Sequence, residues 1–589
     1  MTAERRRDGM VIGGIFVISV CLRFALGCYY PRTVNCYPDE LLYLSAAESL
    51  WNNHTVMVYN LPSNFGKIGY ALLLAPLFSI GDIKVRMYAV AFVNSFVISL
   101  GVFPVYALAK RILQKNTWVI LSVCFYAASS TMTYAMTYTS EVLFIPLMLW
   151  LVYLLYRLLT EEMSTRQKAG LIALIVPVWL LAYLTKELAL VVPVALVMYF
   201  VVQFFARRGQ IAGGRKVLVG LVILAVACIG LYTLSNAGTE YYQLGFDWTL
   251  LRERMWYLLY GFVFYLVTTV IAFLFVPILY PVVFCKNMDE KARRLCLFLV
   301  CLLVSTAATV SYTIYMYEDY PSLTPRAHIR YVEYAFVPFL ILLFHLLEQK
   351  KEAFCLRRVL LLAVCCGVVL LCFSGFNGQT IDNTMLFFMQ VFTEDGHVFL
   401  PYKARLLTLL LILVVAILTY LFYNNSKYFI IVLLSGLSLV TLGNNVLSTY
   451  IQYKTHTHSG AEAAETWEVR ALVLEHSEDN FVILEPQNHS EMLDTYLVDC
   501  DNVRVLTEGV SWYYALTGGD LEQYGLWADG SMVQGSYEAP QRVQYLLLYD
   551  AAYAVDEGAH KVASYPTIGY SLYRLDDDAW FPEIRMQLQ

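Results

Sequence analysis

Residues 10–29 read MVIGGIFVISVCLRFALGCY, an apolar run that contains one charged side chain, Arg23. A helix of about 20 mostly apolar residues is long enough to cross a lipid bilayer. Similar runs recur along the chain, and two of them read VLLLAVCCGVVLLCF at 359–373 and LLTLLLILVVAILTYLF at 406–422. We therefore predict an α-helical multi-pass membrane protein with about 13 spans: 10–29, 85–109, 117–135, 142–159, 169–184, 188–205, 217–234, 256–284, 295–315, 334–347, 359–373, 406–423 and 428–442.

The composition agrees with this reading. Of the 589 residues, 59% are hydrophobic and 15% are charged, whereas ordinary soluble domains are about half apolar and about a quarter charged. Most of the 13 cysteines fall in apolar runs and no CxxC pair occurs, so a zinc or redox site has little support. The composition excludes a soluble enzyme, a disordered scaffold and a nucleic-acid-binding protein, and no nucleic-acid partner is expected.

Charge divides the chain into two bodies. Up to residue 450 there are 34 Lys and Arg against 23 Asp and Glu, and beyond it 7 against 23, which gives +11 and −16. We predict a transmembrane catalytic domain over 1–448 and a soluble α/β domain over 449–589. In the second domain the pattern predicts a helix at 462–476 and strands at 481–484, 503–506, 543–548 and 570–575.

The distribution of Lys and Arg predicts the orientation, because these residues are retained on the cytoplasmic side of short loops. With the amino terminus inside, the inner segments hold 22 of them and the longer outer segments hold 11. We expect a bacterial plasma-membrane protein whose amino terminus is cytoplasmic and whose C-terminal domain is extracytoplasmic. The long segments at 30–84, 235–255, 316–333 and 374–403 then place the chemistry on the outer face.

The first outer segment carries two adjacent acids, Asp39 and Glu40, in the stretch YPDELLYLSAAESLW at 37–51. Tyr43 and later apolar residues share one helical face, which predicts an interfacial helix within 30–84. Asp39 is explained structurally as a helix N-cap. Alternatively, a carboxylate at a membrane interface can be tuned to act as a general base, and Asp39 and Glu40 are the catalytic candidates.

Positive side chains for an anionic ligand occur in the same outer segments. Arg offers a planar fork for phosphate oxygens and Lys a point charge, although each could instead snorkel or pair with a nearby acid. Glu141 is a third outer acid, and as a negative charge near the amino terminus of the span at 142–159 it also has a structural explanation. We predict no metal site, since the sequence has no second cluster of carboxylates spaced as metal ligands. The sequence does not exclude a divalent metal. The candidates are Lys67, Lys186, Arg326, Arg330 and Tyr331 for a lipid phosphate, with Glu141, His328 and Tyr43 as accessory or acceptor-side residues.

These motifs, in this order, resemble the GT-C superfamily of integral-membrane glycosyltransferases, in the branch of protein O-mannosyltransferases and aminoarabinose–lipid A transferases. The resemblance rests on Asp39-Glu40 after the first span, KIGY at 67–70 running into an apolar segment, Thr185-Lys186 after the fifth span, and Arg330-Tyr331 before the tenth. The chain departs from aminoarabinose-type relatives in having LLYL at 41–44, without a basic residue, and in lacking Pro-Pro after Lys67.

The resemblance implies a polyprenyl-phosphate-linked monosaccharide donor and no further cofactor. Asp39 would be the general base that deprotonates the acceptor hydroxyl, or the residue that orients it. Lys67 and Arg330, with Tyr331, would hold the donor phosphate, and Lys186 is a weaker candidate. Direct attack from the opposite face would invert the anomeric centre. The acceptor would be a glycan, a lipid or a protein, and membrane lipid would be a further partner.

Two other functions fit a multi-pass protein with an aromatic tail. A transporter or flippase of lipid-linked sugars would line a path at mid-membrane with polar residues, but acids are nearly absent from the centres of the predicted spans. A non-catalytic glycan-binding membrane protein would not need Asp39 and Arg330 together. The pattern favours the transferase.

Overall fold

The fold was analysed in a computed structural model of the chain. The structure describes residues 3–29, 38–58, 61–62, 66–206, 248–273, 275–317, 329–349, 393–394, 398–399, 414, 417–418, 421, 426–456, 460–485, 493, 497, 499–500, 502–507, 526–528, 531–533, 544–551, 553–557, 559–575 and 583–586. The predicted spans at 217–234 and 359–373 lie outside these residues, as does most of the span at 406–423.

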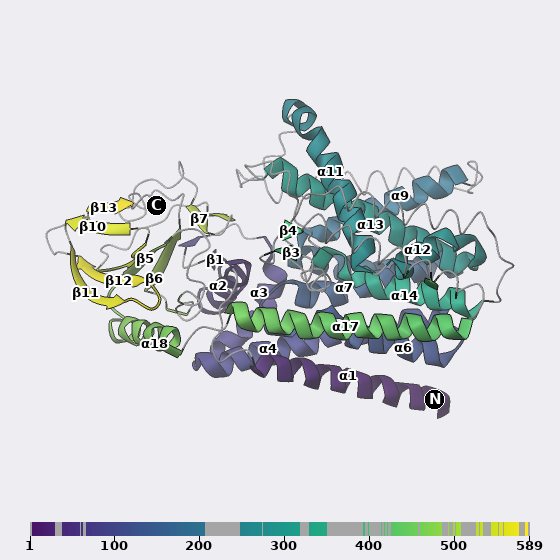
Figure 1. Cartoon of the computed structure of the whole chain (residues 1–589), viewed down its shortest axis with the longest axis horizontal. Helices are drawn as coiled ribbons and strands as arrows, with labels where there is room; N and C mark the ends of the chain where they lie inside the picture. The colour runs from purple at the N-terminus through teal and green to yellow at the C-terminus, as the bar shows by residue number, and fades with distance from the viewer. Residues whose placement is uncertain are drawn as a thin grey trace.

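The molecule is mostly helical, as predicted, with a body of helices beside a smaller region of strands (Figure 1). Within the described residues, seven stretches are long and apolar enough to cross a membrane. The body contains α1 (Ala3–Tyr29), α4 (Ile83–Ser99), α5 (Val102–Ile112), α6 (Asn116–Ala127), α7 (Glu141–Thr160), α8 (Thr165–Thr185), α9 (Val191–Ala206), α11 (Trp248–Ala272), α12 (Val276–Val283), α13 (Glu290–Tyr317), α14 (Glu333–Glu348) and α17 (Ser426–His456).

Several predicted spans are interrupted within the described residues, which corrects the expectation of continuous helices. The span at 117–135 is α6 followed by a 3-10 turn, η2 (Ser130–Met136). The span at 256–284 breaks between α11 and α12, where Phe275 has a φ of 57°. The span at 85–109 is divided into α4 and α5 at Gly101, where an added Cβ would lie 2.1 Å from the Tyr126 hydroxyl. Apolar periodicity carries no signal for such local backbone breaks.

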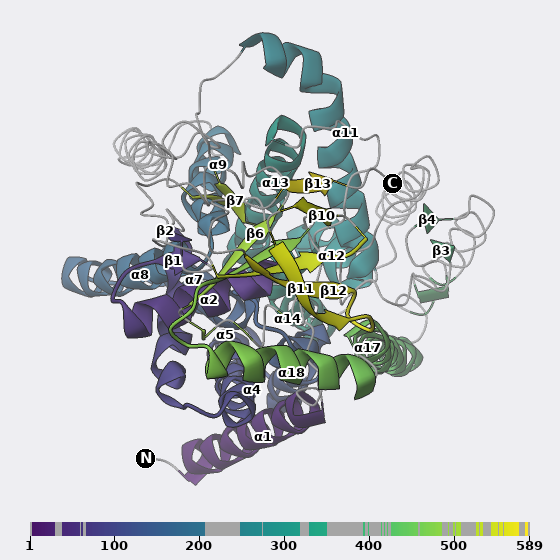
Figure 2. The ribbon, with the colours of Figure 1, turned by 90° about the vertical axis from the view of Figure 1, so that its left-hand side faces the viewer.

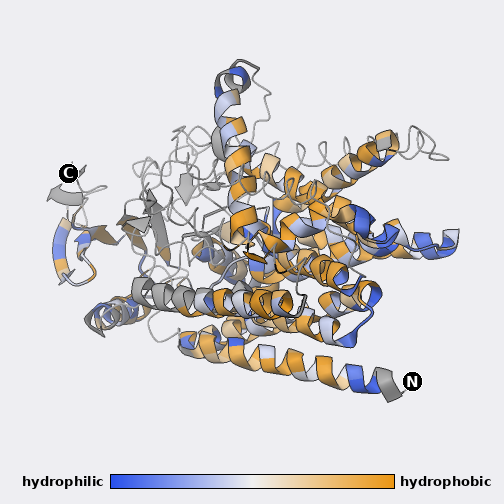
Figure 3. Cartoon of the chain, turned by 45° about the vertical axis from the view of Figure 1, so that its right-hand side comes forward, coloured by the Kyte–Doolittle hydropathy of each residue, from blue (hydrophilic) through white to orange (hydrophobic). Residues whose placement is uncertain are grey.

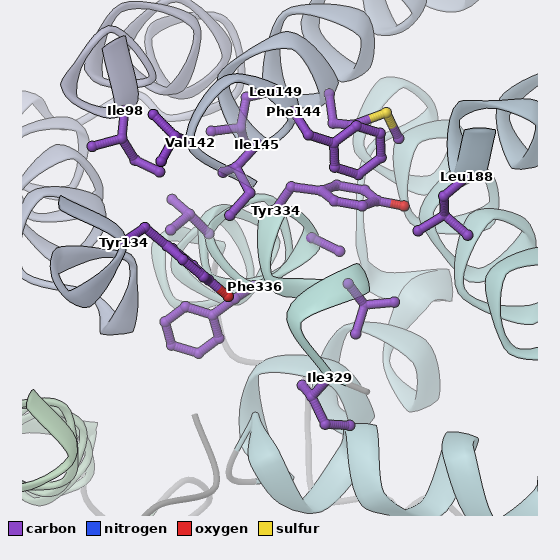
Figure 4. Packing of buried hydrophobic residues seen from close by; sticks show 14 of the residues in the cluster. Ile98, Tyr134, Val142, Phe144, Ile145, Leu149, Leu188, Ile329, Tyr334 and Phe336 are labelled. Carbon is purple, nitrogen blue, oxygen red and sulfur yellow. The ribbon is translucent and has the colours of Figure 1, made fainter. Parts of the chain in front are cut away.

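The core of the body lies around α7 and α14, in which 14 of 20 and 14 of 16 residues are buried. Figure 4 shows Phe144 and Ile145 of α7 beside Tyr334 of α14, and the rings of Phe144 and Tyr334 meet edge to face with centroids 6.2 Å apart. By contrast, α8 exposes Leu180, Leu181 and other large apolar side chains. Figure 3 shows that the helical body is predominantly hydrophobic along the helices, as expected of a surface that faces lipid.

The segment between the first two predicted spans contains α2 (Pro38–Asn52), β1 (Met57–Val58), β2 (Leu61–Pro62), α3 (Ile68–Leu74) and η1 (Ala75–Ser79). The predicted helix is present, but all residues of α2 from 40 to 49 are buried. It therefore differs from the half-exposed interfacial helix that the sequence suggests, because α3, η1 and β1 pack against it.

The strands predicted near the C-terminus are present. The five-stranded sheet has the order β11 (Ala559–Tyr565), β12 (Tyr570–Leu575), β9 (Tyr545–Tyr549), β5 (Phe481–Glu485) and β6 (Val503–Thr507). β5 is parallel to β6 and β9, whereas β12 is antiparallel to β9 and β11. The predicted helix is α18 (Gly460–Glu475), and the boundary predicted at residue 449 falls inside α17. Further strands form two-stranded pairs: β3 (Thr393–Glu394) with β4 (Val398–Phe399), β7 (Leu526–Ala528) with β8 (Ser531–Val533), and β10 (Tyr553–Glu557) with β13 (Glu583–Met586).

The sheet lies across one end of the helical body, at the end away from the amino terminus (Figures 1 and 2). An ionic contact joins the two parts: Asp499 lies 2.5 Å from Arg86 of α4 and 2.6 Å from Arg470 of α18. Burial by itself raises the pKa of the Asp499 carboxyl, but Arg470 and Arg86 together hold it below its ordinary value. This end of the body also carries the candidate site.

Candidate active site

A small cavity of about 80 Å³ gathers most of the predicted site residues that the structure describes. Six of the nine lining residues were expected from the sequence to serve a site, although they come from five separate segments of the chain. The lining consists of Leu42, Tyr43, Lys67, Thr139, Ser140, Glu141, Lys186, Arg330 and Tyr331.

Glu141 is the negative group of this cavity. Its side chain is only 2% exposed, and its Oε1 contacts the Lys186 ammonium and lies 3.5 Å from Nε of Arg330. The Ser140 hydroxyl lies 3.5 Å from the other carboxylate oxygen. Glu187 is the acid next to Lys186 in the sequence, but the lysine instead contacts a carboxylate 45 residues away in the chain.

The Tyr331 ring forms a second wall against the same cations. Nζ of Lys186 lies 4.2 Å from the ring centroid, and Cζ of Arg330 lies 5.4 Å from it. Positive groups are attracted to the negative face of an aromatic ring within about 6 Å. The ring and Glu141 together hold both cations at the cavity.

A close helix contact brings Lys67 and Lys186 to one cavity. Lys67 immediately precedes α3, and Lys186 immediately follows α8. Gly69 lies against the end of α8, where an added Cβ would be 2.5 Å from Oγ1 of Thr185 and 2.9 Å from its backbone nitrogen. Only a residue without a side chain permits this approach.

Two hydrogen bonds hold the strand-like stretch that leads into α7. The backbone N–H of Tyr138 donates to Glu40, at 3.1 Å. The Asn94 amide donates to the Thr137 carbonyl, at 2.9 Å, and accepts from the Tyr70 hydroxyl, at 2.8 Å. Because Thr139, Ser140 and Glu141 follow directly, these bonds fix where they enter the cavity.

Farther from the cavity, Arg23 fixes η2. Its guanidinium is fully buried and donates to the carbonyl and hydroxyl of Thr131, to the Ala127 carbonyl and to Ser19. A buried guanidinium needs such acceptors, because unsatisfied polar groups are costly in an apolar interior.

Asp39 lies in the first turn of α2, four residues before Tyr43. Residues four apart in an α-helix occupy the same face, one turn from each other, so the backbone of Asp39 lies one turn from a residue that lines the cavity. Its side chain is outside the described part of the chain, as are Arg326 and His328. Glu40 is buried and does not line the cavity.

Sequence reasoning missed several residues that build the site. Leu42, Thr139 and Ser140 line it, and Asn94 holds the segment that carries two of them. Thr139 and Ser140 could have been found from their position beside Glu141, but nothing local marks Asn94. Within the described residues, no group of three or more His, Cys, Asp and Glu side chains is arranged to hold a metal ion.

The chemistry offered by the cavity is that of an anion site. Among its described lining, three side chains are positive and one is negative. Two of the positive side chains are largely buried, with exposures of 14% for Lys186 and 19% for Arg330. Charges held in a partly dry site interact more strongly than in water, and Arg and Lys are the side chains that bind phosphate.

Known proteins resemble this chain in sequence over one part and in fold over nearly all of it. Residues 68–232 match the family model described as dolichyl-phosphate-mannose-protein mannosyltransferase. Comparison with curated protein sequences gave no match. Among solved structures, ArnT from Cupriavidus metallidurans bound to undecaprenyl phosphate is similar, with 12% identity, a TM-score of 0.52, and coverage of 96% of this chain and 98% of that one.

Two weaker similarities accompany it. The apo state of the same ArnT gives a TM-score of 0.48 at 12% identity, over 95% of this chain and 98% of that one. The archaeal oligosaccharyltransferase AglB from Archaeoglobus fulgidus, in complex with an inhibitory peptide and a dolichol-phosphate, gives 0.44 at 11% identity, over 91% and 69%. With a family model matched over 68–232 and the ArnT architecture extending across nearly the whole chain, this protein has the fold of the GT-C membrane glycosyltransferases.

Proposed function

We propose that this protein transfers a monosaccharide from a polyprenyl-phosphate donor to an acceptor on the outer face of the membrane. The observation that carries the proposal is the convergence of Lys67, Lys186 and Arg330 on one cavity that also contains Tyr43, one helical turn from Asp39. The undecaprenyl phosphate bound in the similar ArnT structure supports a lipid phosphate as the anion.

In the proposed reaction, an acceptor hydroxyl oxygen attacks the anomeric carbon of the donor sugar. The bond from that carbon to the phosphate oxygen breaks, and its electron pair stays on the phosphate. Asp39 accepts the hydroxyl proton, and attack from the face opposite the phosphate inverts the anomeric centre. Lys186 and Arg330 stabilise the charge that develops on the leaving phosphate, as fixed positive groups do in other active sites.

Glu40 has a supporting part in this scheme. Its carboxylate accepts from the Tyr138 backbone inside the protein, at 3.1 Å, and so positions the segment that carries Glu141. Asp39 is therefore the proposed base, and Glu40 is a positioning residue. The acceptor, be it a glycan, a lipid or a protein, would approach from the side of the sheet.

The test is a transfer assay with purified protein and radiolabelled polyprenyl-phosphate sugars. We expect Asp39→Asn to lower turnover by at least about 100-fold while donor binding persists, since a positioned base contributes about 10²–10⁴. Arg330→Ala should instead weaken donor binding. Asp82→Asn is a matched control, because Asp82 caps α4 through the backbone of Lys84 and Val85. Wild-type turnover in Asp39→Asn would refute the assignment of Asp39 as the base. Equal donor affinity in Arg330→Ala and wild type would refute the phosphate site.

A further inference from the structure

Glu141 poses a problem for a phosphate site. A carboxylate in the cavity repels a phosphate, yet Glu141 is almost completely buried there and contacts both Lys186 and Arg330. A lining without this carboxylate would carry a larger positive charge. Glu141 therefore affects both the position of the two cations and the charge that a phosphate meets.

The charges of the cavity and of its ligands can be compared. The described residues of the lining include three positive side chains and the negative Glu141, a net charge of +2. A sugar-linked lipid monophosphate carries one negative charge, and the lipid phosphate released on transfer carries about two at neutral pH, since its second pKa is about 6. The corresponding diphosphate ligands carry one negative charge more.

We propose that Glu141 is a specificity determinant that matches the cavity to lipid monophosphates and disfavours lipid diphosphates. This inference rests on the proposed function and adds a residue to it. Lys186 and Arg330, which Glu141 contacts, complement the monophosphate as the glycosidic carbon–oxygen bond breaks and its charge rises from one to two. The additional negative charge of a diphosphate is left facing the Glu141 carboxylate.

The fixed walls of the cavity support the same assignment. They are held by the Tyr331 ring and by the close approach of α3 to α8 at Gly69. Glu141 is itself held at the first residue of α7, next to the segment that Glu40 and Asn94 anchor. The charges that select between ligands are therefore held in place by the fold.

The experiment measures dissociation constants of purified full-length protein for geranyl phosphate and geranyl diphosphate at pH 7.5, by titration calorimetry in detergent. Wild type should prefer the monophosphate. Glu141→Gln keeps the shape and one acceptor oxygen but removes the charge, and we expect the ratio of the two constants to shift toward the diphosphate by about tenfold, a factor equal to 1.4 kcal/mol. Glu141→Asp keeps the charge and should keep the wild-type preference.

Removing a positive charge provides an independent variant. Lys186→Gln removes one positive charge and should move the ratio further toward the monophosphate, which tests the inference even if Glu141→Gln does not fold. The double variant Glu141→Gln/Lys186→Gln restores the wild-type net charge and should return the ratio toward wild type.

The outcomes separate the two proposals. If wild type binds geranyl phosphate and Arg330→Ala weakens that binding, but neither Glu141→Gln nor Lys186→Gln changes the ratio, the selectivity inference is wrong and the proposed function stands. If wild type binds neither probe, both are wrong. Equal ratios in Glu141→Asp and Glu141→Gln would also overturn the inference, because shape and not charge would then set the preference.

Discussion

Replacing Gly69 with alanine tests how the fold assembles the cation site. An added Cβ would lie 2.5 Å from Oγ1 of Thr185, 2.9 Å from its backbone nitrogen and 3.1 Å from the Leu184 carbonyl carbon. The Thr185 side chain can rotate away, but the backbone contacts require α3 and α8 to separate. Bringing the nitrogen to an ordinary contact of 3.4 Å requires a displacement of about 0.5 Å.

Two measurable effects follow from this displacement. Overpacking of this kind typically costs about 1–3 kcal/mol of stability, which should appear as a lower melting temperature in detergent. Lys67 and Lys186 flank the contact, so they should also move apart. Because a misplacement of about 1 Å can cost about 100-fold in rate, we expect sugar transfer to fall about tenfold and the dissociation constant for geranyl phosphate to rise.

The chain supplies a matched control one residue from the same lysine. Gly66 has no atom within 4 Å of an added Cβ, so Gly66→Ala changes the same residue type beside Lys67 without forcing the helices apart. Wild-type stability and binding are expected for it. If Gly69→Ala bound geranyl phosphate and transferred sugar as well as Gly66→Ala, the close approach of α3 to α8 would not be what positions the two lysines.

Three further predictions concern groups outside the cavity. Asp499→Asn should lower the free energy of unfolding by about 1–3 kcal/mol at pH 7, as expected when a hydrogen-bonded buried carboxylate is lost. Because the pKa of Asp499 is depressed in the folded protein, its contribution to stability is present above the ordinary aspartate pKa and disappears as the pH falls through the folded-state pKa. The melting temperatures of variant and wild type should therefore converge in acid. A constant difference at every pH would contradict this. Arg23→Leu should destabilise the protein by about 1–3 kcal/mol per carbonyl left without a donor, and it should reduce sugar transfer. Thermal unfolding and the transfer assay measure these two effects. A melting temperature equal to that of wild type would be inconsistent with the hydrogen bonds from Arg23 to Thr131. Glu40→Gln should retain most transfer activity, because its amide oxygen can still accept the hydrogen bond from the Tyr138 backbone N–H. Complete loss of transfer in a folded variant would instead indicate that Glu40 is a catalytic residue.

Much of the architecture was predictable because the membrane imposes a simple rule. A spanning segment must be apolar over a length that matches the bilayer, so stretches such as α7, α8 and α13 can be recognised from composition alone. The strands near the C-terminus follow similarly from short apolar runs, as in β5 and β12. Local backbone breaks, at Phe275 and after Ala127, depend on tertiary packing and leave no periodic signal.

The candidate residues were identifiable from the sequence because charges at membrane depth are expensive and few. Lys67, Glu141, Lys186 and Arg330 each had an ordinary structural explanation when considered alone. What the sequence could not decide was their pairing, since Lys186 has an acid as its immediate neighbour and nevertheless contacts Glu141.

Only the tertiary structure decided that these groups share one cavity. Their proximity depends on contacts between distant segments: Gly69 against Thr185, Glu40 with the Tyr138 backbone, and Asn94 with Thr137. Such contacts are set by the distances to which helices can approach, a property of packed side chains in three dimensions. The types of side chain are local and can be read from the sequence, whereas the distances that turn them into a site arise from the packing of the whole body.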